Sequence, residues 1–422
     1  MPDRHGSDMI LFQHASVLDA AAGRLLKDRF VLVDGATILQ VSEQRPEAAA
    51  GAQVIDARGK VLMPGLIDCH VHCLASQVHL GRLATLPNVL AVLRAVPLLR
   101  GMLERGFTTV RDAGGADYSL AEATRSGVIE GPRIFPSGRA LSQTGGHGDF
   151  RERSDVIEPC ACTPKIGAIA RVVDGVDAVR LAVREEIQKG ATQIKIMASG
   201  GVASPNDPVH FLGYSEDEIR AIVEEAANAG TYVMAHAYTG RAIARAVRCG
   251  VRTIEHGNLV DAEAAAVMAA HGAIAVPTLA TYEALANEGA ALGFPPEAVA
   301  KIEAVRGDGL RSLERFAQAG VRMAFGSDLL GESQRHQSEE FALRARVLGA
   351  AEAIRAATTH AAFVLNMEGR LGTVAAGAIA DLLLIDGNPL DNIDLLRGQG
   401  SAIVLTMKDG RILKNTLPGD SQ

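Results

Sequence analysis

The sequence predicts an α/β protein in which a (β/α)8 barrel of the TIM type carries a small β-sandwich module built from both chain termini. Three observations support this prediction: a length of 422 residues, eight apolar strand-like runs that alternate with helical segments, and β-rich segments at both ends. Trp is absent and aromatic residues make up only 4%, so the core must consist mainly of Ala, Val, Leu and Ile. A core of this kind suits the packing of helices on strands.

Both ends of the chain read as short strands joined by turns. Near the N-terminus, Asp34-Gly35 lies between two β-rich runs, as in a tight hairpin. The same pattern of β-rich runs around a turn occurs at Arg58-Gly59 and, near the C-terminus, at Asp409-Gly410. Because chain ends often meet in one module, we expect these strands to form a single composite unit. Its predicted extent is residues 1–63 together with 365–422, which leaves 64–364 for the barrel.

Eight apolar runs alternate with helical segments between the two ends. The runs comprise residues 65–72, 107–112, 133–138, 192–197, 231–236, 251–256, 273–277 and 321–328. Ser215 with Glu218 makes a capping box at the start of one intervening helix. The longest loops, 139–170 and 198–213, follow strands three and four. Loops after barrel strands build the active-site face of such a barrel.

The charge and composition exclude several classes of partner. The net charge is −7 and no Lys/Arg-rich run occurs, so we expect neither nucleic acid nor an anionic membrane as partner. Acidic residues interrupt the first apolar stretch, so a signal peptide is not expected, and no run of about 18 apolar residues could span a bilayer. Five scattered cysteines, an odd number, fit a reducing cytoplasm. We further expect a homo-oligomer.

Two histidines and a lysine interrupt the predicted strands. His70 and His72 are two residues apart, so a strand points both at one face, where they could bind a metal. The alternative is that both histidines lie in the core or at the rim with their hydrogen bonds satisfied by the protein. Lys195 lies between Ile194 and Ile196, and a lysine buried in a strand is costly unless it is paired or chemically altered. A neutral amine can take up carbon dioxide to form a carbamate, whose two oxygens could bridge two cations.

Three further residues occur where predicted strands end. His236 and His256 end strands five and six, and Asp328 ends strand eight. Ligands at one mouth of a barrel would converge on a point. Four imidazoles and a bridging carbamate supply nitrogen and hard oxygen donors, which suit Zn²⁺ and are tolerable for Mn²⁺ or Co²⁺.

At this point the chain resembles the amidohydrolase superfamily. The motif PGLIDCHVH looks like its strand-one HxH motif, and the ending ADLLLIDGNPL is similar to its closing β-module. The resemblance implies two divalent metal ions, with a carboxylated lysine and a hydroxide bridging them. His70, His72 and Asp328 would hold one ion, and His236 and His256 the other, with Lys195 as the bridging lysine.

More narrowly, TTVRDAGG, SGRALSQTGGHGD, IKIMASGGVASPNDP and RTIEHGN resemble the imidazolonepropionase-related branch, and within it prolidase-like metallo-carboxypeptidases, some of which hydrolyse ochratoxin A. The resemblance implies cleavage of the amide bond to a C-terminal amino acid. Asp328 would carry the proton to the leaving nitrogen. His147 and Tyr238 would bind the tetrahedral oxyanion or the substrate carboxylate, in an order that the sequence leaves open. Arg139 and His210 are weaker candidates for carboxylate binding.

Two other hypotheses remain at this point. A cyclic amide hydrolase similar to imidazolonepropionase would resemble a one-metal design without a strand-four lysine, so Lys195 weighs against it. A non-catalytic scaffold on the same barrel would have lost metal ligands, whereas all six positions are filled here.

Overall fold

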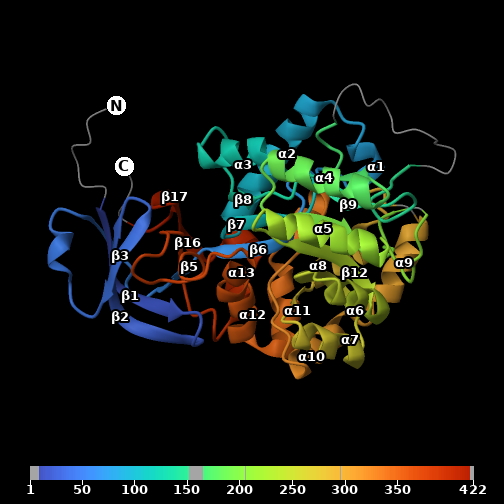
Figure 1. Ribbon diagram of the computed structural model, residues 1–422. Coiled ribbons are helices and arrows are strands. Elements are labelled where there is room, and N and C mark those ends of the chain that lie inside the picture. The colour runs from blue at the N-terminus through green and yellow to red at the C-terminus, as the bar shows by residue number, and fades with distance from the viewer. Residues whose placement is uncertain (1–8, 152–164, 205, 295, 419–422) are drawn as a thin grey trace.

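The computed structural model describes residues 9–151, 165–204, 206–294 and 296–418. A β module and a larger barrel lie side by side, and the first and last strands that the structure describes both belong to the module (Figure 1). The predicted fold class is confirmed. The division of the chain at residues 63/64 and 364/365 stays a prediction.

The module is one eight-stranded sheet made from both ends of the chain, in the order β17-β16-β15-β5-β1-β2-β3 with β4 beside β1. The strands are β1 (Met9–Asp19), β2 (Arg24–Asp34), β3 (Thr37–Ser42), β4 (Gln53–Asp56), β5 (Val61–Pro64), β15 (Leu382–Ile385), β16 (Ile403–Lys408) and β17 (Arg411–Asn415). The two ends meet where β5 pairs antiparallel with β15. Phe12 and Val31 from one end and Leu384 from the other are fully buried in a shared apolar core.

Two of the three predicted hairpins are confirmed, and the third prediction is wrong. β2 and β3 pair antiparallel across the turn at Gly35, and β16 and β17 pair antiparallel across Asp409-Gly410. Around Arg58-Gly59 the chain also turns, with positive φ at both residues. However, β4 and β5 both run parallel to β1. The turn therefore shifts the chain sideways between two segments of the same direction, and the Gly59 amide is held by the His14 carbonyl at 2.8 Å.

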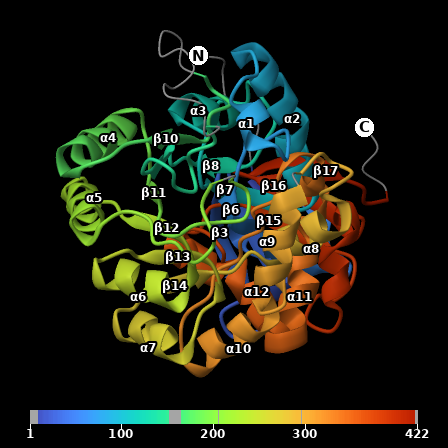
Figure 2. The same cartoon turned by 90° about the vertical axis from the view of Figure 1, so that its right-hand side faces the viewer.

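Seven regular parallel strands form the barrel, and helices surround them when the molecule is viewed as in Figure 2. The strands are β6 (Leu66–Val71), β7 (Phe107–Asp112), β8 (Arg133–Phe135), β11 (Ile194–Met197), β12 (Val233–Thr239), β13 (Thr253–Leu259) and β14 (Ile274–Val276). The short strands β9 (Ala140–Ser142) and β10 (Ala170–Val172) extend the sheet beside β11. A hydrogen bond of 2.8 Å from the Thr192 amide to the Pro136 carbonyl joins the two halves of the barrel.

The helices follow the strands in alternation, as expected. They are α1 (Leu80–Leu83), α2 (Asn88–Glu104), α3 (Tyr118–Arg125), α4 (Val176–Gln188), α5 (Glu216–Asn228), α6 (Gly240–Arg248), α7 (Ala262–Ala270), α8 (Leu279–Glu288), α9 (Pro296–Arg306), α10 (Gly309–Gln318), α11 (Glu339–Leu348), α12 (Ala350–Ala356) and α13 (Thr359–Val364). The predicted capping box of Ser215 and Glu218 starts α5. Among the helices described, none is long and apolar enough to cross a membrane.

The eighth barrel position departs from the predicted strand 321–328. No regular strand forms in this part of the described chain, yet its backbone bonds to both neighbours. The Ala324 amide donates to the Ala275 carbonyl of β14, and the Asp328 amide donates to the His70 carbonyl of β6, at 2.9 and 2.8 Å. The ladder stays short because the backbone of Asp328 turns to a φ of 51°. The segment thus closes the barrel without a long ladder.

Strand three is shorter than predicted and its loop is more ordered than predicted. Pro136 has no amide hydrogen, so the β8 ladder ends at Phe135 instead of residue 138. The chain turns at Gly138, with a φ of 66°, before β9 begins. The predicted loop 139–170 therefore contains β9 and reaches β10, and its residues 152–164 lie outside the described part of the chain.

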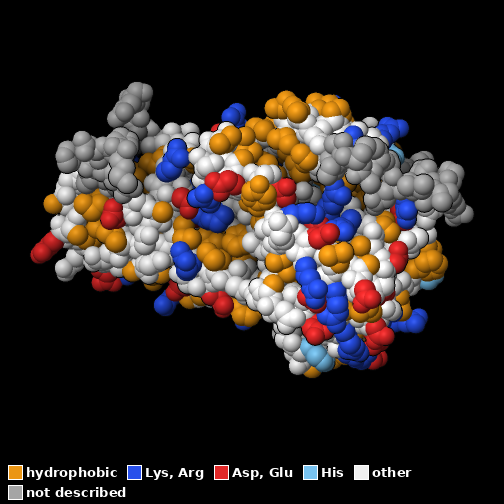
Figure 3. Space-filling view, turned by 45° about the horizontal axis from the view of Figure 1, so that its top comes forward, with side chains coloured by type: hydrophobic (Ala, Val, Ile, Leu, Met, Phe, Trp, Pro, Cys, Tyr) orange, Lys and Arg blue, Asp and Glu red, His pale blue; other side chains and the backbone are white. Residues whose placement is uncertain are grey.

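Charged side chains of both signs are interspersed on the face shown in Figure 3, over barrel and module alike. Charged side chains also join the two parts. Arg133 on β8 bonds Asp381 beside β15 at 2.6 Å and also pairs with Asp409 in the β16–β17 turn. Asp381 is buried, so this contact differs from an ordinary surface ion pair.

We predict that Asp381→Ala lowers the free energy of unfolding by about 3 kcal/mol, because it leaves the Arg133 charge without its buried partner. Urea unfolding followed by circular dichroism measures this change. Glu43→Ala provides the control, since Glu43 forms an exposed pair with Arg29 and its loss should cost at most about 1 kcal/mol. Equal effects of the two substitutions would contradict a structural role for the Arg133 network.

Candidate metal centre

The carboxyl ends of the barrel strands carry the six residues that the sequence predicted as metal ligands. They are His70 and His72 at the end of β6, Lys195 in β11, His236 in β12, His256 in β13 and Asp328 at the eighth position. The four histidines and the lysine are all buried. The strand period has therefore turned these side chains toward the interior of one barrel mouth, as the sequence predicted.

Asp328 lies at the centre of this cluster. Its Oδ1 atom is 3.4 Å from Nε2 of His70 and 3.2 Å from Nε2 of His72, and its Oδ2 atom is 3.8 Å from Nδ1 of His256. His70, His256 and Asp328 offer donor atoms that all lie within 4.8 Å of one another. His236 joins the group through its ring, whose centroid is 4.6 Å from that of His256. Five of the six predicted ligands are thus connected, four of them around Asp328 and the fifth, His236, through His256.

Each imidazole has one nitrogen that a protein group already occupies. Nδ1 of His70 bonds Glu255 at 2.7 Å, and Nδ1 of His72 bonds the Gly114 carbonyl at 2.9 Å. Nδ1 of His256 bonds the Thr278 hydroxyl at 2.8 Å, and Nε2 of His236 bonds the Gly200 carbonyl at 3.2 Å. Such partners fix the ring and the tautomer of a metal-binding histidine. The donor set therefore fits a metal centre.

The charge states of the cluster also fit. Burial and the neighbouring histidines and lysine lower the pKa of His236 well below its ordinary value, and burial likewise lowers that of His256. Both rings are then neutral and can offer a lone pair. Although burial opposes its ionisation, the surrounding histidines hold the pKa of Asp328 well below the ordinary range. Two neutral imidazoles close to a carboxylate provide donor atoms that divalent cations prefer.

Two of these residues adopt an unusual backbone conformation. His256 has a φ of 71° and Asp328 a φ of 51°, in the left-handed region that costs a residue with a side chain about 1–2 kcal/mol. His256 lies within β13, where the pairing with β12 shifts register, and Asp328 lies at the end of the eighth barrel segment. Backbone strain of this kind, held by the surrounding structure, is typical of functional sites.

Lys195 lies in β11, where it pairs in register with Met234 of β12. Burial lowers the pKa of its amine to about 8, an effect that the carboxylates of Glu255 and Asp328 partly offset. No acidic group of the described residues lies within ion-pair distance of this amine. The alternative of a salt-bridged lysine therefore has no partner in the described structure, and a neutral amine is accessible near neutral pH.

Sequence reasoning missed the buried pair that supports His70. Glu255 accepts two bonds of 3.0 Å from Arg111, and both side chains are fully buried inside the barrel. Asp68 supports the same strand end, since it accepts from the His70 amide at 3.0 Å. The sequence did contain a signal for this pair. Arg111 and Glu255 are charged residues inside apolar strands, as Lys195 is.

His147 lies against the cluster from the loop after β9. Its ring stacks on that of His236, with centroids 4.1 Å apart. Its Nδ1 atom bonds Ser204 at 2.6 Å and Asp207 at 3.1 Å, both in the loop after β11. The side chain of Lys301 on α9 in turn holds three carbonyls of that loop, those of Gly201, Ser204 and Asp207. His147 is therefore oriented by a carboxylate in a loop that is itself anchored.

Tyr238 lies beside the metal ligands, whereas the two weaker candidates lie elsewhere. The Tyr238 ring is 4.8 Å from that of His236 and 5.3 Å from that of His256. Arg139 directs its guanidinium to the Lys165 carbonyl at 3.0 Å. His210 is exposed and packs edge-on against Phe211. Of the four predicted substrate groups, His147 and Tyr238 thus contact the cluster.

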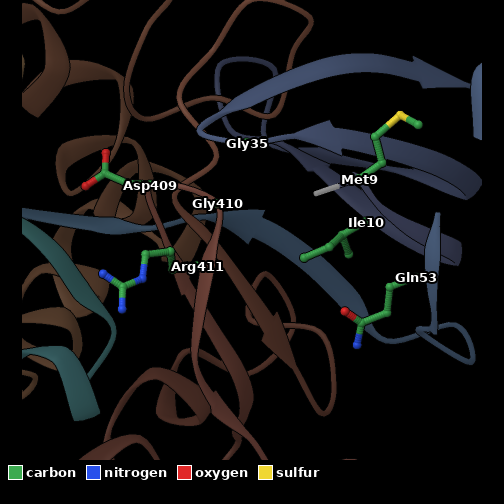
Figure 4. A pocket seen from close by; sticks show the side chains of 7 residues that line it. All are labelled: Met9, Ile10, Gly35, Gln53, Asp409, Gly410 and Arg411. Atoms are coloured by element: carbon green, nitrogen blue, oxygen red, sulfur yellow. The ribbon is translucent and has the colours of Figure 1, made fainter. Parts of the chain in front are cut away.

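A separate hollow of about 360 Å³ lies in the β module, between the ends of β1 and the β16–β17 turn (Figure 4). The side chains of Asp409 and Arg411 point away from Met9 and Ile10 on its far side. Asp409 is already paired with Arg133. The hollow contains none of the predicted site residues.

The barrel, the closing β-module and the histidine-carboxylate cluster together define a metal-dependent hydrolase, and comparison with known proteins agrees. Residues 61–413 match the model of the amidohydrolase family. The chain belongs to this family, whose members are generally metal-dependent enzymes, and it is a hydrolase that acts on amide bonds.

Three relatives narrow the comparison. Ochratoxinase from Aspergillus niger is 34% identical over 374 residues, which cover 85% of this chain and 76% of the relative. Imidazolonepropionase from Rubrobacter xylanophilus is 25% identical over 403 residues, 86% of this chain and 84% of the relative. A crystal structure of a prolidase complexed with N-methylphosphonate-L-proline is 61% identical, with a TM-score of 0.94 over 96% of this chain and all of that one. The predicted likeness to this branch is confirmed.

We predict that Glu255→Gln weakens metal binding by about 10- to 100-fold, because an amide cannot hold His70 as the ionised carboxylate does. Titration of the metal-free protein with Zn²⁺ or Co²⁺ measures the affinity, and circular dichroism checks the fold. Glu263→Gln on the exposed face of α7 serves as the control, with unchanged affinity expected. Wild-type affinity in Glu255→Gln would show that the carboxylate only neutralises Arg111.

Proposed function

We propose that the protein is a binuclear metal-dependent amidohydrolase that cleaves the amide bond to a C-terminal amino acid. The substrates would be Xaa-Pro dipeptides, N-acyl amino acids and ochratoxin-like amides. The observation that carries this proposal is the position of His147 and Tyr238 against His236, which places two polar groups beside the predicted metal ligands. The names of the relatives agree, since one is an ochratoxinase and another is a prolidase that binds an L-proline derivative.

In this proposal, two divalent cations, Zn²⁺ or alternatively Mn²⁺ or Co²⁺, are held by His70, His72, His236, His256, Asp328 and a carbamate formed on Lys195 from carbon dioxide. When bound, they would supply Lewis acidity that polarises the amide carbonyl and lowers the pKa of water toward the neutral range. Asp328, ionised and at the centre of the ligands, would accept the proton of the attacking water at a carboxylate oxygen and pass it to the leaving nitrogen.

His147 and Tyr238 would supply the hydrogen bonds to the substrate. With Nδ1 of His147 engaged by Asp207 and Ser204, the Nε2 atom is the one available to the substrate. The Tyr238 hydroxyl is the second donor. One would bind the tetrahedral oxyanion and the other the α-carboxylate of the amino acid, since an unpaired charge in a buried site is costly. We place the enzyme in the cytoplasm as a homo-oligomer.

Metal content separates this proposal from its alternatives. We predict about two equivalents of metal per chain in the wild type, whereas a one-metal cyclic amide hydrolase would hold one and a non-catalytic scaffold none. Lys195→Ala should lose metal and activity together, because the bridge is gone. A short carboxylic acid such as propionate should restore part of the activity, while leaving His147→Asn unrescued. Full metal content and full activity in Lys195→Ala would contradict the bridging role.

The substrate test compares an N-acyl amino acid with its C-terminal amide. We predict that the amide has a kcat/KM lower by about 10²-fold or more, about 2.7 kcal/mol of transition-state binding, because the carboxylate is recognised. N-acetyl-L-proline and N-acetyl-L-phenylalanine, each paired with its amide, are suitable substrates. Equal values for acid and amide would rule out carboxylate recognition and would favour a cyclic amide substrate.

A further inference from the structure

Four side chains form a chain from the predicted metal ligand His256 to Tyr238, with a hydrogen bond at each end. Nδ1 of His256 bonds the Thr278 hydroxyl at 2.8 Å, and Tyr282, one helical turn after Thr278, has its phenol beside that hydroxyl. The Tyr282 hydroxyl donates to the Tyr238 hydroxyl at 2.9 Å. All four side chains are at most 2% exposed, so water does not compete for these bonds.

The surrounding structure holds these four side chains rigidly. Thr278 and Tyr282 are one helical turn apart at the start of α8, directly after β14. The Tyr238 ring lies nearly parallel to that of His256, at 27° with centroids 5.3 Å apart, and the Tyr282 ring packs edge-on against Tyr238. Tyr238 and Tyr282 share an apolar cluster with Leu285. The two phenols therefore have little freedom to exchange partners.

The number of protons on these groups determines the direction in which the hydrogen bonds are donated. A metal-binding imidazole is neutral and offers one nitrogen lone pair. With its other nitrogen given to a metal, His256 carries its proton on Nδ1 and donates it to Thr278. Each hydroxyl has one proton to donate. Because Thr278 accepts from His256, its own proton points away from that ring, and Tyr282 donates to Tyr238. The Tyr238 proton is left over at the end of the chain, where it can be donated to an oxygen of the substrate.

Resting on the proposed function, we propose that Tyr282 is a positioning residue which, with Thr278, fixes Tyr238 as a hydrogen-bond donor to an anionic oxygen of the substrate. The ligand class is a carboxylate or a tetrahedral oxyanion. Hydrogen bonds in such a chain polarise one another, so the Tyr282 bond also strengthens Tyr238 as a donor. A chain running the other way would present a lone pair, which repels an anion.

The test is a double-mutant cycle on the metal-loaded protein. The readouts are the dissociation constant of N-methylphosphonate-L-proline, from calorimetry, and kcat/KM for an N-acyl amino acid. We expect Tyr238→Phe to weaken phosphonate binding by about 10- to 100-fold and Tyr282→Phe by about 5- to 10-fold. The double variant should be no weaker than Tyr238→Phe, because Tyr282 acts through Tyr238. Tyr214→Phe is the control: it removes a buried hydroxyl that donates to the Val173 carbonyl, and it should change binding less than about 2-fold.

Thr278→Val tests the other end of the chain without any substrate. It should weaken binding of Zn²⁺ by about 10-fold, because His256 loses its acceptor. Additive losses in the cycle, or wild-type phosphonate affinity in Tyr282→Phe, would overturn the positioning role. Unchanged metal affinity in Thr278→Val would overturn the link to His256. Tight phosphonate binding by a wild type that hydrolyses no N-acyl amino acid would overturn the proposed function alone, and a wild type that does not bind the phosphonate would overturn both.

Discussion

The ion pair of Arg111 and Glu255, fully buried inside the barrel, is the interaction that supports the candidate metal centre from below. Although burial opposes its ionisation, Arg111 holds the pKa of Glu255 far below the ordinary range, so the carboxylate stays charged. A charged Glu255 always accepts from Nδ1 of His70, at 2.7 Å. The Nε2 atom of His70 is then the one that faces Asp328. A charge in the core of the barrel thus sets the tautomer of a ligand at its mouth.

The same arrangement recurs around the cluster, each time with a partner from another part of the chain. The carbonyls of Gly114 and Gly200 hold His72 and His236, and Thr278 holds His256. None of these partners needs a metal to be in place, so the predicted ligands are already oriented for a cation. Organisation of this kind reduces the entropy that binding would otherwise cost.

The residues of the candidate metal centre could be singled out from the sequence, whereas their hydrogen-bond partners could not. Strand periodicity and the position of a residue at a strand end are short-range properties, which is why His70 and Asp328 became candidates without a structure. Glu255 meets His70 across 185 residues, and Lys301 meets the Asp207 carbonyl across 94. Such contacts depend on how the barrel closes. The eighth barrel segment shows a different limit. Its apolar pattern predicts a regular strand, but the left-handed backbone of Asp328 ends the ladder.

The site therefore has two parts with different supports. The predicted metal ligands are anchored to the barrel interior, where the chain has few alternatives. His147 is positioned by Asp207 from a loop that Lys301 anchors to α9, and Tyr238 by Tyr282 from α8. His147 and Tyr238, the proposed substrate-binding residues, are supported by α8, α9 and the loop after β11. Changes in those elements can therefore alter which amide is accepted while His70 and Asp328 keep their geometry. Division of labour of this kind explains how one barrel can serve relatives as different as an ochratoxinase and a prolidase.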